Sequence, residues 1–368
     1  NNAMSLVLRI SFIFSLIIHL IFRSVNLVTE LLLCVNNFGI GERLLRLHTY
    51  LILELAIFII LLCPLSLAWE QTITSNPSVV STRGHFGLDT GELLPGHNTT
   101  DFMAVNIPGF QVGACPPEIA IYVHGVWANE REFLEQMDRL TMSLHSDRYV
   151  VPVVGFSWDS NTGFSPHGWQ IAKNIANQNG PKLAHFISDL KNTCQRTNIR
   201  IIAHSLGANV TNSTLVNLDN TKTWKNNAFK ITSVDLLGAA VNSDTPSINR
   251  SFGKAIEHVV DKFYNVYDPM DDMLFLDCTA NEQHAVLGLV GAGSQVIRPA
   301  NYIQQDVAYD LQHRDANGTA QIDCLDYLVP LYDNHCGYIG FRDPLNHNSI
   351  ISDGVISVVV ADWKETKP

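Results

Sequence analysis

Short apolar runs alternate with segments of helical periodicity over residues 118–368, and the runs predict buried strands. These runs lie at 119–123, 149–156, 199–203, 231–236 and 259–267. Helices are predicted at 130–144, 168–190, 206–218 and, at the C-terminus, 350–363. Strands that are apolar throughout are typical of a mostly parallel sheet covered by helices on both faces. The pattern therefore predicts a doubly wound α/β domain.

Two regions depart from this alternation. Residues 69–117 are rich in Ser, Thr, Gly and Pro and show no sustained period, so they are expected to form an irregular lead-in. Residues 278–342 form the longest irregular stretch within the domain. We expect an insertion, a cap or long loops around a site there, before the C-terminal helix.

Residues 1–68 form a hydrophobic leader with two apolar runs, at 5–22 and 50–68. The second run follows basic residues and ends at Ala68, with small residues at the two positions that signal peptidase reads. It predicts a cleaved signal peptide, a mature start near Trp69 and a secreted protein. The first run has about the length that crosses a bilayer, so a retained membrane anchor is the alternative.

Charge and cysteine content narrow the class of protein further. The net charge of −11 argues against a nucleic-acid-binding protein, which needs a basic face. No C-x-x-C pair occurs, so neither a zinc nor a redox site is predicted. Export would permit one or two disulfides among the cysteines that follow the leader. These are Cys115, Cys194, Cys278, Cys324 and Cys336.

A candidate nucleophile, Ser205, lies between the predicted strand 199–203 and the helix that follows it, in the segment A-H-S-L-G. Small residues on both sides of a serine are needed where a strand turns sharply into a helix, because larger side chains would collide. Such a turn exposes the serine hydroxyl and directs the Leu206 N–H toward a developing oxyanion. The alternative is that Ser205 only caps its helix.

A second element lies upstream, where His124 and Gly125 follow the first strand of the domain. A His-Gly pair in this place turns the backbone so that the next N–H, that of Val126, supplies the other oxyanion donor. In this interpretation His124 holds the loop and transfers no proton in the reaction. The combination favours a catalytic Ser205 over a capping one.

These motifs, V-H-G at 123–125, S-W-D-S at 157–160 and A-H-S-L-G at 203–207, resemble the lipase/esterase branch of the α/β-hydrolase superfamily. The similarity is to a set of archaeal and bacterial α/β hydrolases and spans roughly 119–363. It implies the α/β-hydrolase fold and a Ser-His-Asp triad. It also implies that the acid and then the histidine follow Ser205 along the chain.

Four aspartates are candidates for the triad acid: Asp235, Asp268, Asp271 and Asp272. Asp235 lies inside a predicted strand rather than after one. The segment 265–274 is similar to an N-x-Y-x-P-x-D-x-x-L pattern of the related hydrolases, and this match assigns the acid to Asp271. Its role would be to hold the histidine tautomer and stabilise the imidazolium. The alternative is an acidic turn in water or a cation site.

Two histidines between the last strand and the final helix are candidates for the base, and each follows an asparagine. His335 lies in N-H-C-G-Y-I-G-F, and its His-x-x-Tyr spacing is similar to the histidine loop of the related hydrolases. His347 lies closer to the start of the final helix, which is the usual position of the base. We match the base to His335 and keep His347 as the alternative.

Oxygen-bearing side chains recur in the segment 315–326 with the spacing of a calcium loop. They are Asp315, Asn317, Thr319, Asp323 and Asp326. The segment resembles a dockerin-type repeat, although Ala320 replaces the usual glycine and Asp326 the usual glutamate. We predict a structural Ca²⁺ site here and no required cofactor. The alternative is a plain Asp- and Asn-rich turn.

The expected activity is hydrolysis of a small-molecule or lipid carboxylic ester through an acyl-enzyme on Ser205. Four aromatic residues near strand ends, Trp127, Phe156, Trp158 and Phe164, are candidates for an acyl pocket. An amidase, thioesterase or lactonase would use the same triad, so these activities remain alternatives. A non-catalytic, exported binding protein with this fold is the alternative from another class.

Overall fold

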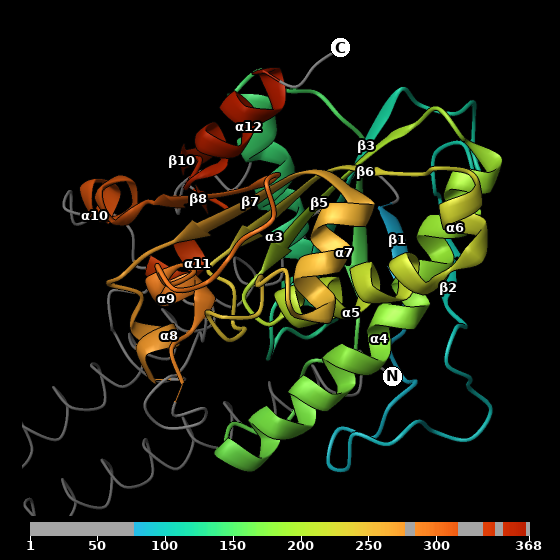
Figure 1. Ribbon diagram of the computed structural model, residues 1–368, viewed down its shortest axis with the longest axis horizontal. Helices are drawn as coiled ribbons and strands as arrows, with labels where there is room; N and C mark the ends of the chain where they lie inside the picture. Colours follow the sequence, from blue (N-terminus) through green and yellow to red (C-terminus); the bar gives the residue numbers. More distant parts are fainter. Residues whose placement is uncertain (1–76, 277–283, 316–333, 343–348, 366–368) are drawn as a thin grey trace, which may run out of the picture. The chain divides into compact units, whose positions relative to one another are not determined.

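The computed structural model describes residues 77–276, 284–315, 334–342 and 349–365 (Figure 1). The chain divides into two compact units, 1–74 and 75–368, and every described residue belongs to the second. The predicted leader therefore lies outside the described residues. Within them, no helix is both long enough and apolar enough to cross a bilayer.

An eight-stranded sheet organises the described part of the chain. Its strands are β1 (Ser78–Ser81), β2 (Met103–Val105), β3 (Glu118–Val123), β4 (Val153–Ser157), β5 (Asn198–His204), β6 (Ile231–Leu237), β7 (Val260–Tyr267) and β8 (Tyr302–Asp306). Their spatial order is β2-β1-β4-β3-β5-β6-β7-β8, and every neighbouring pair is parallel except β1 with β2. The predicted mostly parallel sheet is confirmed.

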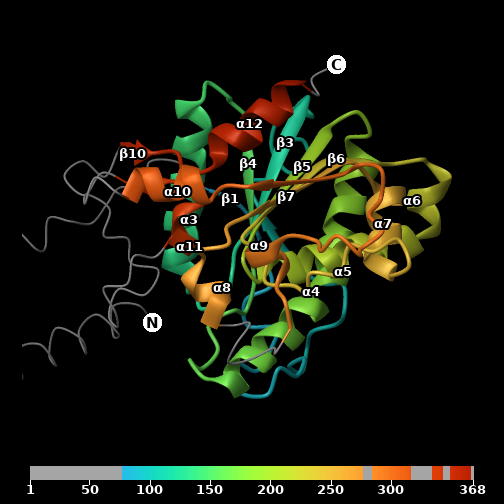
Figure 2. The same ribbon diagram turned by 60° about the vertical axis from the view of Figure 1, so that its left-hand side comes forward.

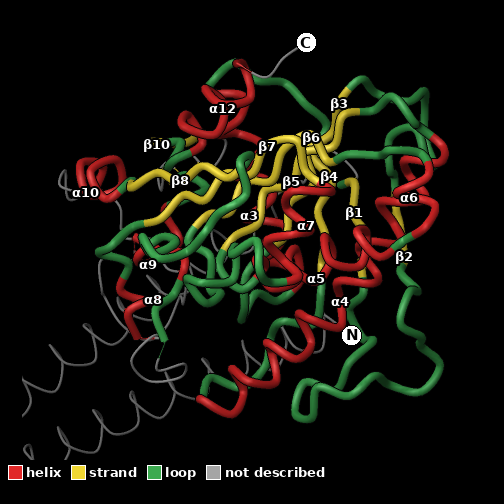
Figure 3. Tube along the Cα trace, viewed as in Figure 1, coloured by secondary structure: helices red, strands yellow, loops and turns green. Residues whose placement is uncertain are grey.

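Both faces of this sheet carry helices (Figures 2 and 3). One face is covered by α4 (Pro166–Thr193), α5 (Gly207–Asn220) and α7 (Ser251–Val259), with the short α6 (Lys222–Asn226) beside them. The other face is covered by α3 (Glu130–Ser146) and α12 (Ile356–Glu365). The short helices α8 (Asp272–Leu276), α9 (Leu287–Val290), α10 (Ala308–Asp315) and α11 (Asn334–Gly337) complete the described set.

The alternation of side chains along each strand divides the interior into two apolar clusters. In β3, Ile121 and Val123 pack into one cluster, whereas Ala120 and Tyr122 pack into the other. Because successive side chains point to opposite faces, a strand covered on both sides is apolar at most positions on both faces. This requirement explains why the inner strands could be recognised in the sequence.

Two regions expected to be irregular contribute strands. Residues 69–117 supply β1 and β2, and residues 278–342 supply β8. In β1 only Val80 is fully buried, and β8 has a single buried residue, Tyr302. Such short, half-exposed strands near the edges of a sheet lack the continuous apolar run of an inner strand. The predicted C-terminal helix also proves shorter, because β10 (Ile350–Ser352) pairs with β9 (Phe341–Arg342) before α12 begins.

A disulfide joins the segment before β3 to the end of α4. Cys115 and Cys194 have Cα atoms 5.5 Å apart, and Cys194 is the C-cap of α4. Cys336 is also disulfide-bonded. The domain therefore contains disulfides, as export would permit.

Candidate active site

The turn between β5 and α5 holds Ser205 in a strained backbone conformation. Its φ of 54° lies in the left-handed region, which a residue other than glycine adopts rarely and which recurs at active sites. A Cβ atom on Gly207 would lie 2.4 Å from the Val123 carbonyl oxygen, so this position requires glycine. The predicted sharp turn is confirmed. The capping alternative is wrong, because Leu206 is the N-cap of α5 and no side chain caps that helix.

The loop after β3 touches Ser205 directly. A Cβ atom on Gly125 would lie 2.9 Å from the Ser205 Cβ and 3.4 Å from its Oγ, so only glycine leaves room for the serine side chain. The backbone N–H groups of Val126 and Leu206 have no hydrogen-bond partner among the described residues. Two backbone donors therefore flank Ser205 without an internal acceptor.

His124 is fully buried within this loop. Its Nδ1 lies 2.8 Å from the Gly125 carbonyl oxygen, and its Nε2 accepts a hydrogen bond from the Trp158 N–H at 3.1 Å. Burial and the nearby Arg83 guanidinium hold the pKa of His124 well below its usual value. The ring is therefore neutral and held in place, which agrees with the structural role predicted for it.

The S-W-D-S motif supports the same loop from the end of β4. The Trp158 indole N–H donates to the His124 carbonyl at 3.0 Å. Ser160 accepts a hydrogen bond from the Trp127 N–H at 2.9 Å, and its hydroxyl donates to the Ala128 carbonyl at 2.9 Å. The motif thus holds the backbone of the loop that contacts Ser205.

Asp271 and His335 form a buried hydrogen-bonded pair. Asp271 Oδ2 lies 2.7 Å from His335 Nδ1, and both side chains are buried. The other oxygen, Asp271 Oδ1, accepts from the Leu274 N–H at 2.9 Å, which fixes the carboxylate plane. The pairing with a carboxylate places the proton on His335 Nδ1 and leaves Nε2 as the basic nitrogen.

His204 was not among the predicted site residues, but it links the Asp271–His335 pair to the turn at Ser205. Its Nε2 donates to the His335 backbone carbonyl at 2.8 Å, and the two rings lie 4.8 Å apart. Burial, together with the neighbouring His335, lowers the pKa of His204 to about 3, so the ring stays neutral. Because His204 precedes Ser205 in the chain, this bond brings the histidine segment to the serine. The Ser205 hydroxyl itself makes no hydrogen bond within the described residues.

The other candidate acids occupy different surroundings. Asp235 lies within β6 and accepts hydrogen bonds from the Trp363 indole and the Ser233 hydroxyl. Asp268 Oδ1 accepts from the Met270 N–H, and Asp272 is exposed at the start of α8. His347 and the calcium candidates Asn317, Thr319, Asp323 and Asp326 lie outside the described residues, and Asp315 ends α10.

The aromatic candidates for an acyl pocket divide into two kinds. Phe156 and Trp158 have no exposed surface and belong to the core, so their assignment to a pocket is wrong. Phe164 is 62% exposed, and its ring lies 4.6 Å from that of Trp127. Trp127 follows Val126 and is itself in the left-handed region, with a φ of 56°. This aromatic pair therefore borders the loop at Ser205.

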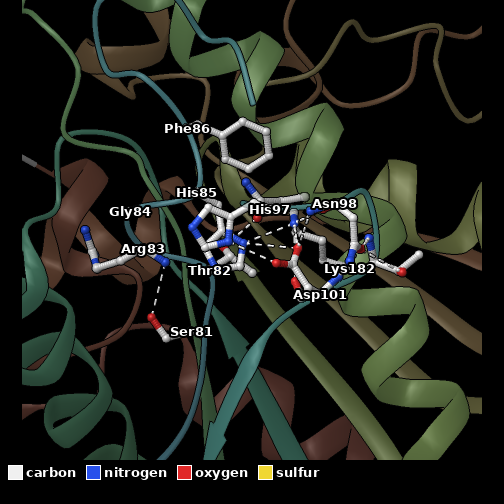
Figure 4. Close-up of polar contacts among 12 residues, drawn as sticks. Ser81, Thr82, Arg83, Gly84, His85, Phe86, His97, Asn98, Asp101 and Lys182 are labelled. Atoms are coloured by element: carbon white, nitrogen blue, oxygen red, sulfur yellow. Dashed lines mark hydrogen bonds and ion pairs between the residues drawn. The ribbon is translucent and has the colours of Figure 1, made fainter. Parts of the chain in front are cut away.

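Away from Ser205, His85, His97 and Asp101 gather as a group that has the residue types of a metal site (Figure 4). Two observations argue against metal binding. The Lys182 ammonium already lies against Asp101 Oδ1 and 3.1 Å from His85 Nδ1. The imidazole rings of His85 and His97 stack face to face with their centroids 3.8 Å apart, so their in-plane lone pairs cannot point at one ion. The group acts as a clamp between the lead-in and α4.

Comparison with known proteins agrees with the fold. A family described as an alpha/beta hydrolase of unknown function matches residues 115–281. Over these residues the chain is similar to that family, and its mostly parallel, helix-covered sheet has the α/β-hydrolase fold. No curated protein matches it.

Similar solved structures include two hydrolase-related proteins. The catalytic core domain of acetyl xylan esterase from Trichoderma reesei is 11% identical, with a TM-score of 0.30, over 52% of this chain and 83% of its own. A lipase-esterase related protein from Clostridium acetobutylicum is 12% identical, with a TM-score of 0.27, over 52% of this chain and 85% of its own.

Proposed function

We propose that the chain is a serine hydrolase that cleaves carboxylic esters through an acyl-enzyme on Ser205. The observation that carries this proposal is the strained turn at Ser205, with Gly125 against the serine and the Asp271–His335 pair joined to the same turn through His204. Strained residues beside a buried acid–histidine pair are typical of an activated nucleophile.

In the proposed reaction, Ser205 Oγ attacks the ester carbonyl carbon while His335 Nε2 takes the hydroxyl proton. Asp271 stabilises the imidazolium that forms. The N–H groups of Val126 and Leu206 donate to the oxyanion of the tetrahedral intermediate. The C–O bond to the alcohol then breaks, and the alcohol leaves with the proton from His335. Water attacks the acyl-enzyme in the same way and releases the acid.

The proposed substrates are small-molecule or lipid esters, and no cofactor is needed for this chemistry. We also propose that the chain is exported, either secreted or anchored to a membrane. The Cys115–Cys194 disulfide supports export, because disulfides persist mainly in oxidising compartments. A structural Ca²⁺ site at 315–326 remains a separate proposal, which metal analysis of the purified chain would test.

Labelling with a fluorophosphonate probe tests the nucleophile. We expect the wild type and a Ser188→Ala control to react and Ser205→Ala not to react. Ser188 is a suitable control because its hydroxyl bonds within α4, to the Ala184 carbonyl. Labelling of Ser205→Ala, or none of the wild type, would contradict the proposal. The latter result would favour a binding protein.

The bond that is cleaved is tested by turnover of matched ester, amide, thioester and lactone substrates. We expect the highest kcat/KM for the ester. A wild type that reacts with the probe but prefers another member of the set would retain the serine mechanism and refute the ester specificity.

A further inference from the structure

Arg83 lies in the lead-in, immediately after β1, where its backbone is held on both sides (Figure 4). The Arg83 N–H donates to Ser81 Oγ at 3.2 Å. The next residues are tied to Asp159 of the S-W-D-S motif, whose two oxygens accept from the Gly84 and Phe86 N–H groups, each at 2.9 Å. The base of the arginine side chain is therefore fixed relative to the end of β4.

The Arg83 guanidinium reaches the loop that contacts Ser205. Its Nε donates to the Ser157 hydroxyl at 2.6 Å, and its Nη2 donates to the Ala128 carbonyl at 3.0 Å. The same Nη2 lies 3.4 Å from His124 Nε2. One side chain thus contacts both ends of the segment 124–128.

These contacts select one tautomer of His124. The Trp158 N–H and the Arg83 guanidinium are both donors facing His124 Nε2, so this nitrogen must present its lone pair. The ring proton is then on Nδ1, which donates to the Gly125 carbonyl at 2.8 Å. The opposite tautomer would place a proton against two donors and a lone pair against a carbonyl.

The Gly125 carbonyl and the Val126 N–H belong to one rigid peptide plane. A hydrogen bond that holds the carbonyl therefore also fixes the direction of the N–H, and it polarises that N–H as a donor. Val126 is the residue whose N–H we expect to bind the oxyanion. The hydrogen bond from His124 to the Gly125 carbonyl therefore also orients the N–H group that we expect to contact the oxyanion.

We propose that Arg83 is a positioning residue for the oxyanion hole, acting through the tautomer of His124 and the orientation of the Gly125–Val126 peptide. The proposal rests on the proposed serine hydrolase function. It assigns part of the site to the lead-in, outside the motifs that define the superfamily.

The test compares Arg83→Met and Arg83→Lys with the wild type, using p-nitrophenyl ester turnover and inhibition by a trifluoromethyl ketone, which forms a tetrahedral adduct. We expect Arg83→Met to lower kcat/KM by about 10- to 100-fold, mainly through kcat, since small displacements of oxyanion donors have effects of this order. The ketone Ki should rise by the same factor. Arg83→Lys should recover part of the loss.

Arg131→Met is the matched control, because Arg131 is exposed at the start of α3, just after the loop, and its guanidinium pairs with Glu135 on the same helix. It should change neither kcat/KM nor Ki. Thermal unfolding of each variant shows that the measured chain is folded. Arg83→Met with wild-type kcat/KM, or with an unchanged Ki, would overturn the proposal.

A double-mutant cycle with His124→Phe tests the route of action, since Phe keeps a ring of similar size and removes both nitrogens. If Arg83 acts through His124, Arg83→Met should cost little further activity in this background. Losses that multiply would overturn the proposal. A folded wild type that neither hydrolyses an ester nor binds the ketone would instead refute the proposed function, and the inference would fail with it.

Discussion

Asp235 provides a stability test that also separates it from the candidate triad acid. Its carboxyl group is fully buried in β6, and Oδ1 has no hydrogen-bond partner among the described residues. Burial raises the pKa of Asp235 from 3.8 to about 7, and the nearby Asp362 adds to this, although hydrogen bonds from Trp363 and Ser233 oppose the shift. Folding therefore favours the protonated carboxyl.

The raised pKa of Asp235 determines how the stability of the folded state changes with pH. At pH values below 3.8 both the folded and unfolded states bind the proton, so the group has no effect on stability. Above 3.8 the unfolded chain ionises first, and the folded state loses stability until the pH reaches about 7. At 1.36 kcal/mol for each pKa unit, the full loss is about 4 kcal/mol, and roughly 3 kcal/mol of it falls between pH 5 and pH 9.

Asp235→Asn removes this titration while keeping an oxygen to accept from the Trp363 indole and the Ser233 hydroxyl. We expect the free energy of unfolding of the variant, relative to the wild type, to rise by about 3 kcal/mol from pH 5 to pH 9. The buried amide N–H₂ group lowers the stability of the variant by a similar amount at every pH, so it does not alter this difference. Urea unfolding, followed by tryptophan fluorescence at each pH, measures the difference in unfolding free energy between the variant and the wild type.

The control is Asp189→Asn, which changes a partly exposed carboxylate on α4. A constant difference between Asp235→Asn and the wild type across the pH range would refute the argument from burial. Asp235→Asn should retain ester turnover, whereas Asp271→Asn should lose about three to four orders of magnitude in kcat, as expected for a triad acid. Equal losses would mean that the acid was assigned to the wrong residue.

Three further predictions concern the surroundings of Ser205. His335→Ala should abolish turnover and His347→Ala should leave it within about threefold; loss of activity in the His347 variant alone would transfer the base to that residue. His204→Asn should lower kcat about tenfold, because the hydrogen bond to the His335 carbonyl is lost. Since the pKa of His204 is about 3, the wild-type activity above pH 5 should show a single ionisation on the acidic side of the pH profile. A second ionisation there would contradict this assignment. Phe164→Ala should raise KM for long-chain p-nitrophenyl esters more than for the acetate, and an equal change for both would show that the Trp127–Phe164 pair does not bind the acyl chain.

The inner strands and the sharp turn at Ser205 could be predicted because their requirements are local. A strand covered on both faces is mostly apolar, as in β3, whose last five residues are all buried. A sharp turn at Ser205 needs small neighbours such as Gly207, which the sequence displays directly. By contrast β8, with one buried residue, carries too little pattern to distinguish it from a loop.

The supporting residues could not be predicted, because their partners are distant in the chain. His204 bonds to a residue 131 positions away, and Arg83 contacts His124 across 41 positions. Neither residue shows a periodicity or a motif of its own that points to this role. Their roles emerge only when the parallel sheet brings the carboxyl ends of β1, β4, β3 and β5 to one edge.

The lead-in is therefore an integral part of the α/β domain, although the family match begins at residue 115. β1 pairs with β4 from Val154 to Ser157, so without it an inner strand would become an exposed edge with unpaired backbone groups. The same segment carries Arg83 to the loop at Gly125 and is held against α4 by Lys182. This one segment supplies the pairing of β1 with β4, the contacts of the lead-in with Lys182, and Arg83. These interactions explain why a region with weak secondary-structure signals is nonetheless well packed.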